Sequence, residues 1–171
     1  MVGAAVLLLV LVIVLDSTQQ IESSKSTSKS KSTIRSRDIL TSLNWIRILL
    51  WIFSASSIFN AAWMLIAPQH WYQNLPAHVP EYGPLNTHFV RDIGVAFLIS
   101  GIGLAFAAFR PLERRAFVLF AVFFFLGHAL VHLCEVFMGG AAAHLWKGEL
   151  LLVYLPALML AAISFKLYKA S

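Results

Sequence analysis

Four apolar blocks dominate this chain, and their length constrains the fold more than any other feature. They span approximately residues 45–67, 88–109, 115–138 and 146–168. A helix needs about 20 consecutive apolar residues to cross the hydrocarbon core of a bilayer, and each block meets that length. Backbone polar groups in lipid must be hydrogen-bonded within their own segment, which favours helices. We therefore expect an all-α fold, a multi-pass transmembrane four-helix bundle.

The composition supports a membrane protein and argues against a nucleic-acid-binding one. Only 12% of the residues are charged, against about 25% in a typical soluble domain. The net charge is +5, but every Lys and Arg except Arg91 and Lys147 lies in three short stretches that flank apolar blocks. This clustering is a topology signal, and we expect no nucleic-acid partner. The single cysteine, Cys134, excludes an internal disulfide and any Cys-based zinc or iron–sulfur site.

The region before the first block divides into two parts. Residues 1–15 are almost purely aliphatic, and as a helix they reach about 22 Å, short of a core of about 30 Å. Three interpretations stay open for them: a signal-like segment, a short N-terminal anchor, or an extension outside the working protein. Residues 16–42 are rich in Ser, Thr and Lys and are predicted to be a disordered linker. The four-helix transmembrane domain is predicted to cover 43–171.

The positions of the positive charges predict how the helices are oriented in the membrane. Lys and Arg gather before the first block, between the second and third blocks, and at the C-terminus. The 68–87 and 139–146 loops contain none. Because cytoplasmic loops carry the excess of Lys and Arg, we expect an integral protein of the inner or plasma membrane. Its C-terminus is predicted to be cytoplasmic and both loops outside, with the lipid bilayer as a partner and other membrane subunits as further candidates.

Ionisable residues gather in the outer half of this predicted bundle. Those on the second and third helices are His88, Arg91, Asp92, His128, His132 and Glu135. Spacings of four and seven residues place each set on one helix face, and the helical rise puts the two sets at similar depth. Asn60 and Glu149 add a polar group from the first and fourth helices at about the same level. Since ionisable groups in lipid are costly, they are functional-site candidates by default.

Two interpretations of this cluster involve a bound cofactor. In the first, a transition metal ion is held by His88, Asp92, His128, His132 and Glu135, because imidazole and carboxylate groups are its common protein ligands. In the second, a haem or a quinone is bound by His88, Arg91, Asp92 and His132, with His88 or His132 as a haem axial ligand. The absence of a Cys-x-x-Cys-His motif excludes covalently attached haem.

Two further interpretations need no cofactor. Arg91 could pair with Glu135, and Asp92 with His132, in a network that only fixes how the helices pack. Alternatively, the cluster could belong to a pathway for protons or small solutes, in which His132 titrates near neutral pH. No matching ionisable groups continue into the inner half of the bundle, which argues against a pathway.

Three short motifs carry a resemblance to a known group of proteins. They are Pro68-Gln-His-Trp-Tyr72, Asn86-Thr-His-Phe-Val-Arg-Asp-Ile-Gly94 and Gly127-His-Ala-Leu-Val-His132. Through them the region of about 43–168 resembles small, uncharacterised bacterial four-helix membrane proteins, broadly DoxX-like. Some DoxX-type proteins are linked to quinone-coupled sulfur oxidation, so the resemblance implies a membrane redox role, but it supplies no catalytic residues.

The functional prediction is a multi-pass membrane protein with a His/Asp/Glu pocket in the outer half of the bilayer. That pocket is predicted to bind a metal ion or a redox cofactor, as part of a membrane oxidoreductase. The alternative is a non-catalytic membrane subunit or scaffold whose polar layer is a structural network.

Overall fold

A computed structural model describes residues 31–139, 144 and 146–169 of the chain. Its contacts divide the chain into two units, residues 1–44 and 45–171. In the first unit only the backbone of the start of helix α2 is described. The predicted N-terminal apolar segment 1–15, and residues 16–30 of the predicted linker, lie outside the described residues. The second unit contains all of the features discussed below.

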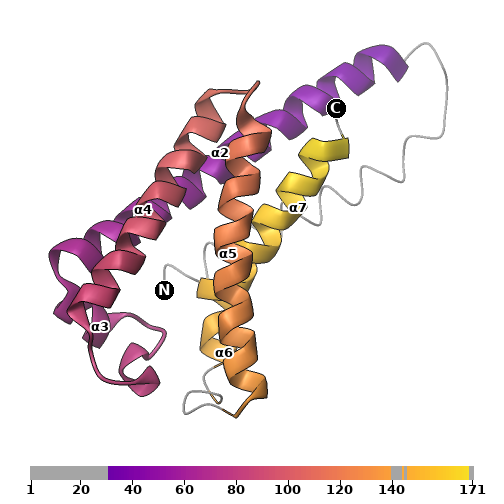
Figure 1. Ribbon diagram of the computed structural model, residues 1–171. Helices are drawn as coiled ribbons and strands as arrows, with labels where there is room; N and C mark the ends of the chain where they lie inside the picture. Colours follow the sequence, from indigo (N-terminus) through magenta and orange to yellow (C-terminus); the bar gives the residue numbers. More distant parts are fainter. Residues whose placement is uncertain (1–30, 140–143, 145, 170–171) are drawn as a thin grey trace. The chain divides into compact units, whose positions relative to one another are not determined.

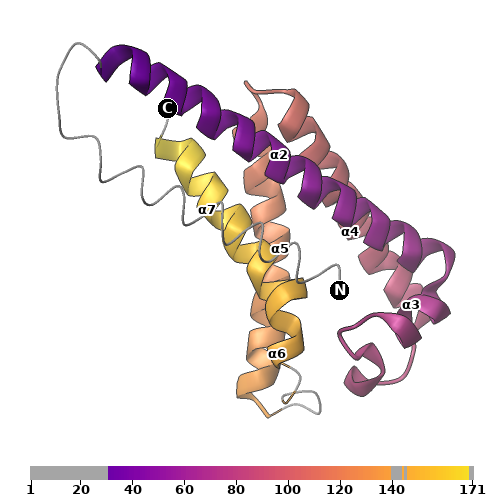
Figure 2. The same ribbon diagram turned by 180° about the vertical axis from the view of Figure 1, so that it is seen from behind.

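The described residues are helical throughout most of their length, and Figure 1 labels the main helices. In chain order the elements are α2 (Lys31–Ile66), α3 (Pro68–Asn74), the 3₁₀ turn η1 (Val79–Tyr82), α4 (Thr87–Phe109), α5 (Arg114–Phe137), α6 (Trp146–Glu149), the π-helical turn η3 (Leu150–Tyr154) and α7 (Leu155–Lys169). Figures 1 and 2 show the second half of α2 beside α4, and α7 beside α5.

Four stretches of the described residues are long and apolar enough to cross a membrane. They are Asn44–Ile66, Thr87–Phe109, Arg114–Phe137 and Trp146–Lys169. Each agrees within two residues with a predicted block, so the prediction of an all-α, multi-pass four-helix protein is confirmed. The helix α2 itself starts earlier, at Lys31, inside the predicted 16–42 linker. Extending an existing helix costs far less than starting one, so the membrane-spanning part can carry helical structure into the polar residues before it.

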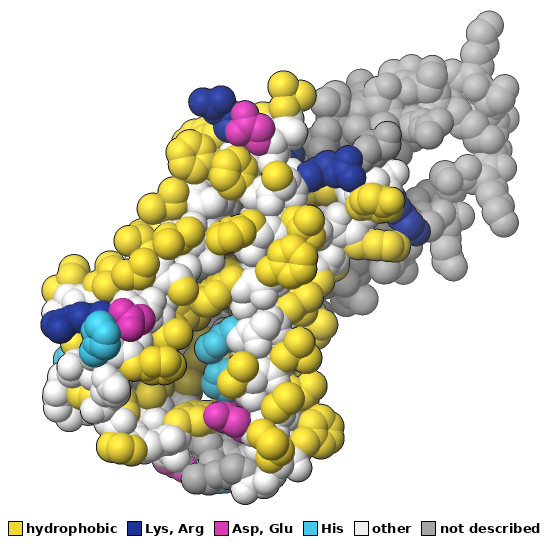
Figure 3. Space-filling view, viewed as in Figure 1, with side chains coloured by type: hydrophobic (Ala, Val, Ile, Leu, Met, Phe, Trp, Pro, Cys, Tyr) yellow, Lys and Arg dark blue, Asp and Glu magenta, His cyan; other side chains and the backbone are white. Residues whose placement is uncertain are grey.

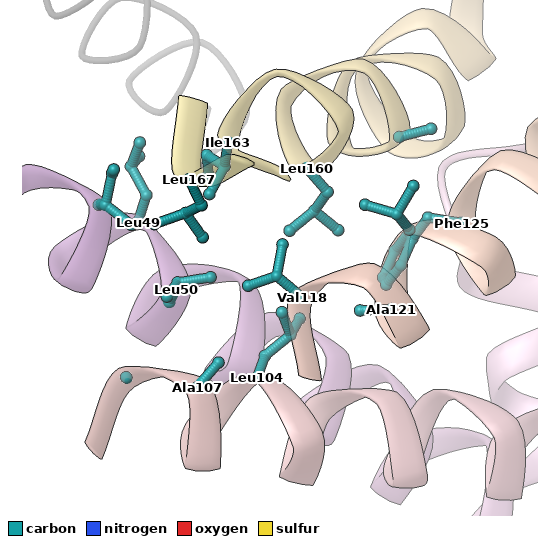
Figure 4. Close-up of a cluster of buried hydrophobic side chains, with 14 of the residues drawn as sticks. Leu49, Leu50, Leu104, Ala107, Val118, Ala121, Phe125, Leu160, Ile163 and Leu167 are labelled. Atoms are coloured by element: carbon teal, nitrogen blue, oxygen red, sulfur yellow. The ribbon is translucent and has the colours of Figure 1, made fainter. Parts of the chain in front are cut away.

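One hydrophobic core joins the four long helices. Figure 4 shows Leu50 of α2, Leu104 of α4, Val118 of α5 and Leu160 of α7 pointing into it, all with no exposed side-chain surface. Because these residues come from all four helices, the core fixes which face of each helix is turned inward. The outward faces carry large apolar side chains such as Phe123, which is 71% exposed, as expected for surfaces in contact with lipid.

The helices α2 and α4 approach each other closely at Gly101. A Cβ atom built there would lie 2.8 Å from Ile58 Cγ1 and 3.1 Å from the Ile58 backbone nitrogen. The Ser54 hydroxyl on α2 donates a hydrogen bond of 2.8 Å to the Gly101 carbonyl. Small residues allow this kind of close packing between membrane helices. Gly101 therefore serves helix packing, as its place inside an apolar block indicates.

The segment between α2 and α4 folds back onto the helix ends. Trp71 of α3 is buried with Met64 and Val90, and its indole N–H donates a 2.9 Å hydrogen bond to the Asn60 side-chain oxygen. The Tyr72 hydroxyl donates to the Gly83 carbonyl at 2.6 Å. We call the end of the bundle that carries this segment the loop end. These contacts hold η1 at that end, close to the polar residues of α5 and α6.

Candidate functional site

A buried carboxylate lies at the centre of the polar residues at the loop end. Glu149, the last residue of α6, is 2% exposed. Its Oε1 lies 2.7 Å from His132 Nδ1 on α5 and also accepts a hydrogen bond from the Tyr82 hydroxyl of η1. Its Oε2 accepts a 3.2 Å hydrogen bond from the Tyr154 hydroxyl. A buried carboxylate is costly unless it is hydrogen-bonded, and these partners from three elements meet that need.

The π-helical turn η3 explains how Tyr154 reaches Glu149. Residues five apart in an α-helix point about 140° away from each other. In η3 the Leu155 N–H donates to the Leu150 carbonyl, and this i→i+5 bonding brings residues five apart onto one side. Pro156 follows directly and has no N–H to donate to Leu152, which breaks the α-helical pattern at this point. Pro156 is thus preceded by a widened turn.

Two histidines of α5, His132 beside Glu149 and His128 one turn further from it, have different surroundings. His132 is held by Glu149, and its ring also meets the edge of the Tyr82 ring at 5.6 Å. The ring of His128 lies 4.7 Å from that of His132, stacks on Phe124 at 6.1 Å and meets Phe97 edge-on at 5.7 Å. Within the part of the chain that the structure describes, no hydrogen bond reaches the ring nitrogens of His128.

These histidines lie on the wall of a hollow. Figure 3 shows it at the loop end, between the α3–α4 side and α5, with histidine side chains of α5 exposed on one wall and an acidic side chain below them. The partly buried Phe97 and Phe124 adjoin the same place. The hollow therefore combines aromatic surface with an imidazole that no described residue hydrogen-bonds and, next to it, a hydrogen-bonded His132–Glu149 pair.

The predicted residues of α4 form a separate group. His88 Nε2 lies 3.5 Å from Asp92 Oδ2, and these side chains are 88% and 60% exposed. Arg91 Nε donates a 3.3 Å hydrogen bond to the Leu65 carbonyl at the end of α2. Figure 3 shows this kind of grouping, with positive, acidic and His side chains together, on the opposite side of the hollow from α5. The charged residues in the first turns of α4 thus find their partners on α4 itself and at the end of α2.

The structure gives no support to the predicted metal site, and it shows ion pairs other than those considered from the sequence. Of the five proposed ligands, His88 lies beside Asp92 and His128 beside His132. The described residues contain no group of three or more His, Cys, Asp or Glu side chains placed to hold a metal ion. His132 pairs with Glu149 and Asp92 with His88, in place of the predicted Asp92–His132 and Arg91–Glu135 pairs. Spacing along a helix fixes a shared face, whereas the partner depends on how the helices are rotated.

Sequence reasoning did not assign Tyr82, Tyr154 or Glu149 to the site. The position of Tyr82 depends on the path of the 67–86 segment, for which the sequence holds no simple signal. Tyr154 could have been suspected, because Pro156 disturbs the helix directly after it. Glu149 was predicted at about the level of the α5 residues, in agreement with its contact to His132, but it was not assigned to the site. A second contact from the loop end, His144 Nε2 to Glu81 Oε2 at 2.9 Å, was also not anticipated.

The arrangement offers hydrogen bonding and proton exchange more than nucleophilic chemistry. His128 can donate or accept one hydrogen bond, and the His132–Glu149 pair can hold or release a proton next to it. No protein-family model, curated protein or solved structure matches the chain. The function is therefore argued from these residues alone.

Proposed function

We propose that this integral membrane protein binds a lipid-soluble redox cofactor of the quinone class in the hollow beside α5, as a subunit of a membrane oxidoreductase. The proposal rests on the surroundings of the His128 ring. Its ring lies between aromatic side chains, yet its ring nitrogens have no hydrogen-bond partner among the described residues. Polar groups inside a membrane protein are normally paired, so an unpaired imidazole beside a hollow suits a ligand with a hydrogen-bond acceptor.

The chemistry of the hollow matches a quinone in three respects. Phe97 and Phe124 offer aromatic faces on which a flat ring packs well. His128 can donate a hydrogen bond to a ring carbonyl. The neighbouring His132–Glu149 pair can supply a proton when the carbonyl is reduced. The electrons come from a redox-active partner in this proposal, which is why the protein is assigned a binding role.

The alternatives with a metal or haem receive less support from the same residues. A metal ion needs three or more ligands around one point, and His132 and His88 are each directed to a carboxylate partner. A b-type haem with two His ligands needs them on facing helices. His128 and His132 share α5, and the remaining described histidines lie in the loop-end segments or at the exposed start of α4. We also propose that the DoxX-like resemblance reflects a shared bundle and a related membrane redox role.

The orientation in the membrane is part of the proposal. We infer that the loop end faces outside and the C-terminus faces the cytoplasm, in an inner or plasma membrane. The Lys and Arg distribution supports this orientation, because Figure 3 shows most positive side chains of this face at the end opposite the hollow. Single-cysteine variants of a Cys134→Ser protein, with cysteine placed at Gln73 or Ser171, test it with a membrane-impermeant thiol reagent on intact cells. Labelling at Ser171 alone would contradict the orientation.

The binding proposal is tested by titrating the purified full chain in mild detergent with decylubiquinone. Quenching of tryptophan fluorescence reports binding. We expect saturable binding to the unaltered protein and about tenfold weaker binding to His128→Leu, which is the loss expected for one hydrogen bond of about 1.4 kcal/mol. His88→Leu is the matched control, because it removes an exposed imidazole outside the hollow, and its affinity should be unchanged. The unfolding temperature of each variant verifies folding.

A second function, that of a structural scaffold, is supported by a specific observation. The same titration distinguishes it from quinone binding. Every fully buried side-chain nitrogen and oxygen of the described residues has a hydrogen-bond partner, and Glu149 alone joins three elements. A scaffold whose polar layer only holds α5, η1 and η3 together would look the same. If decylubiquinone does not bind, or binds His128→Leu equally well, the quinone proposal is wrong and the scaffold is favoured.

A further inference from the structure

A groove between α5 and α7 lies at the end of the bundle opposite the hollow. Its volume is about 500 Å³, and its lining includes Arg115, Ala116, Ala161, Ser164 and Tyr168. The alanines and the serine are small, so the two helices leave a furrow between them at this level. The lining carries mostly apolar surface, with the Arg115 guanidinium as its charged member.

The charged side chains that the structure describes beside this groove are positive. The Arg115 guanidinium lies 5.4 Å from the centre of the Tyr168 ring, and the Lys169 ammonium lies 4.5 Å from that of Phe165. Among the described residues, the ion pair at this end joins Arg110 to Glu113 at 3.8 Å, which leaves Arg115 without a carboxylate partner. Within the described residues, the mouth of the α5–α7 groove therefore carries positive charge.

The charged mouth lies at the boundary of the membrane-spanning region. Arg115 is the second residue of the span Arg114–Phe137, and Tyr168 is the second-last residue of the span Trp146–Lys169. Side chains at such positions extend to the level of lipid headgroups. The apolar part of the groove extends from there along both helices toward Leu119 and Val122, which lie deeper in the hydrocarbon layer.

We propose that the α5–α7 groove binds one anionic glycerophospholipid, with its phosphate at Arg115 and an acyl chain along the groove. Charge complementarity selects an anionic headgroup, and a basic pocket between membrane helices is a common form of lipid site. A guanidinium also matches phosphate geometry with two parallel donors. Free phosphate would use the mouth alone and leave the apolar furrow empty. This inference does not rest on the quinone proposal, since the two sites share no residue.

The test measures lipid retention on the full chain by native mass spectrometry. The detergent-solubilised protein is mixed with equal amounts of 1-palmitoyl-2-oleoyl phosphatidylglycerol and phosphatidylcholine, so that the two probes differ only in headgroup. We expect one phosphatidylglycerol to be retained preferentially. Arg115→Gln should lower that preference about tenfold, as expected for losing a hydrogen bond to a charged group. Arg110→Gln is the matched control, with the same charge change outside the groove, and should keep the preference.

A second pair of variants tests the groove without changing any charge. Ala161→Phe fills the furrow and should reduce retention of both lipids at this site, whereas Ala162→Phe places the same ring on the exposed neighbouring position and should not. The proposal is overturned if the unaltered protein retains both lipids equally, if both arginine variants lose the preference to the same degree, or if inorganic phosphate displaces the bound lipid. Unfolding temperatures confirm that all four variants fold.

Discussion

Gly101 and Gly103 provide a paired test of the close packing between α2 and α4. Both are buried on α4, but they face different surroundings. A Cβ at Gly101 would lie 2.8 Å from Ile58 Cγ1 and 3.1 Å from the Ile58 backbone nitrogen, whereas a Cβ at Gly103 would meet only Phe117 Cδ1 at 3.8 Å. The first pair of distances requires the helices to move apart, and the last is an ordinary contact. Replacing each glycine with alanine should therefore have opposite effects.

The expected magnitudes follow from three contributions. Alanine is favoured over glycine in a helix by about 1 kcal/mol, and this gain applies to both variants. At Gly101, overpacking costs about 1–3 kcal/mol, and separating the helices weakens the Ser54–Gly101 hydrogen bond, worth about 1 kcal/mol. We expect Gly101→Ala to lower the free energy of unfolding by about 1–3 kcal/mol, and Gly103→Ala to raise it by up to about 1 kcal/mol.

The assay is equilibrium unfolding in mixed micelles of dodecyl maltoside and increasing sodium dodecyl sulfate, followed by tryptophan fluorescence. Both variants and the unaltered chain are compared under the same conditions, so that only differences in unfolding free energy matter. If Gly101→Ala is as stable as Gly103→Ala, the close approach at Ile58 does not limit packing, and the reasoning fails. A loss of stability in Gly103→Ala would equally refute it, because no neighbour lies close enough to clash.

Three further changes test the remaining polar contacts with the same unfolding assay. Arg114→Met removes the hydrogen bonds that its guanidinium donates to the last carbonyls of α4 at 2.8 and 3.4 Å, and should cost about 1–3 kcal/mol; an unchanged stability would show that water replaces them. Trp71→Phe keeps the apolar contact but loses the donor to Asn60, and should cost about 1 kcal/mol while increasing proteolysis between residues 67 and 86. Glu149→Leu should cost about 3 kcal/mol or more, and Glu149→Gln roughly half, because the amide still accepts hydrogen bonds; equal losses would contradict this reasoning.

The helices were predictable from sequence because the signal is local. A run of about 20 apolar residues specifies a membrane-spanning helix whatever surrounds it, and the four predicted blocks agree with the described spans. The end of α5 was also predictable: Gly139 has a positive φ of 69°, the conformation for which glycine is favoured at a helix end. The start of α2 was not predictable, because the polar residues into which the helix extends have the same composition as a linker.

The level of the site residues along their helices could be predicted from the sequence, but their side-chain partners could not. His132 and Glu149 were predicted to lie at a similar level, and their contact at 2.7 Å, which joins α5 to α6, agrees with that. Asp92, at a similar predicted depth, pairs with His88 on its own helix instead. Depth follows from counting residues along one helix, whereas pairing depends on how two helices are rotated about their axes. That rotation is fixed by the whole core, which no short motif encodes.

The two ends of the bundle differ in a way that follows from how each handles charge. At the loop end, Glu149 is buried, and a widened turn before Pro156 supplies it with a hydroxyl that a regular helix would direct elsewhere. At the other end, Arg115 stays exposed at the membrane boundary and stacks on Tyr168. Buried charge needs partners from the protein, and Glu149 finds them in His132, Tyr82 and Tyr154. The exposed Arg115 is the group to which the proposed lipid site assigns an anionic headgroup.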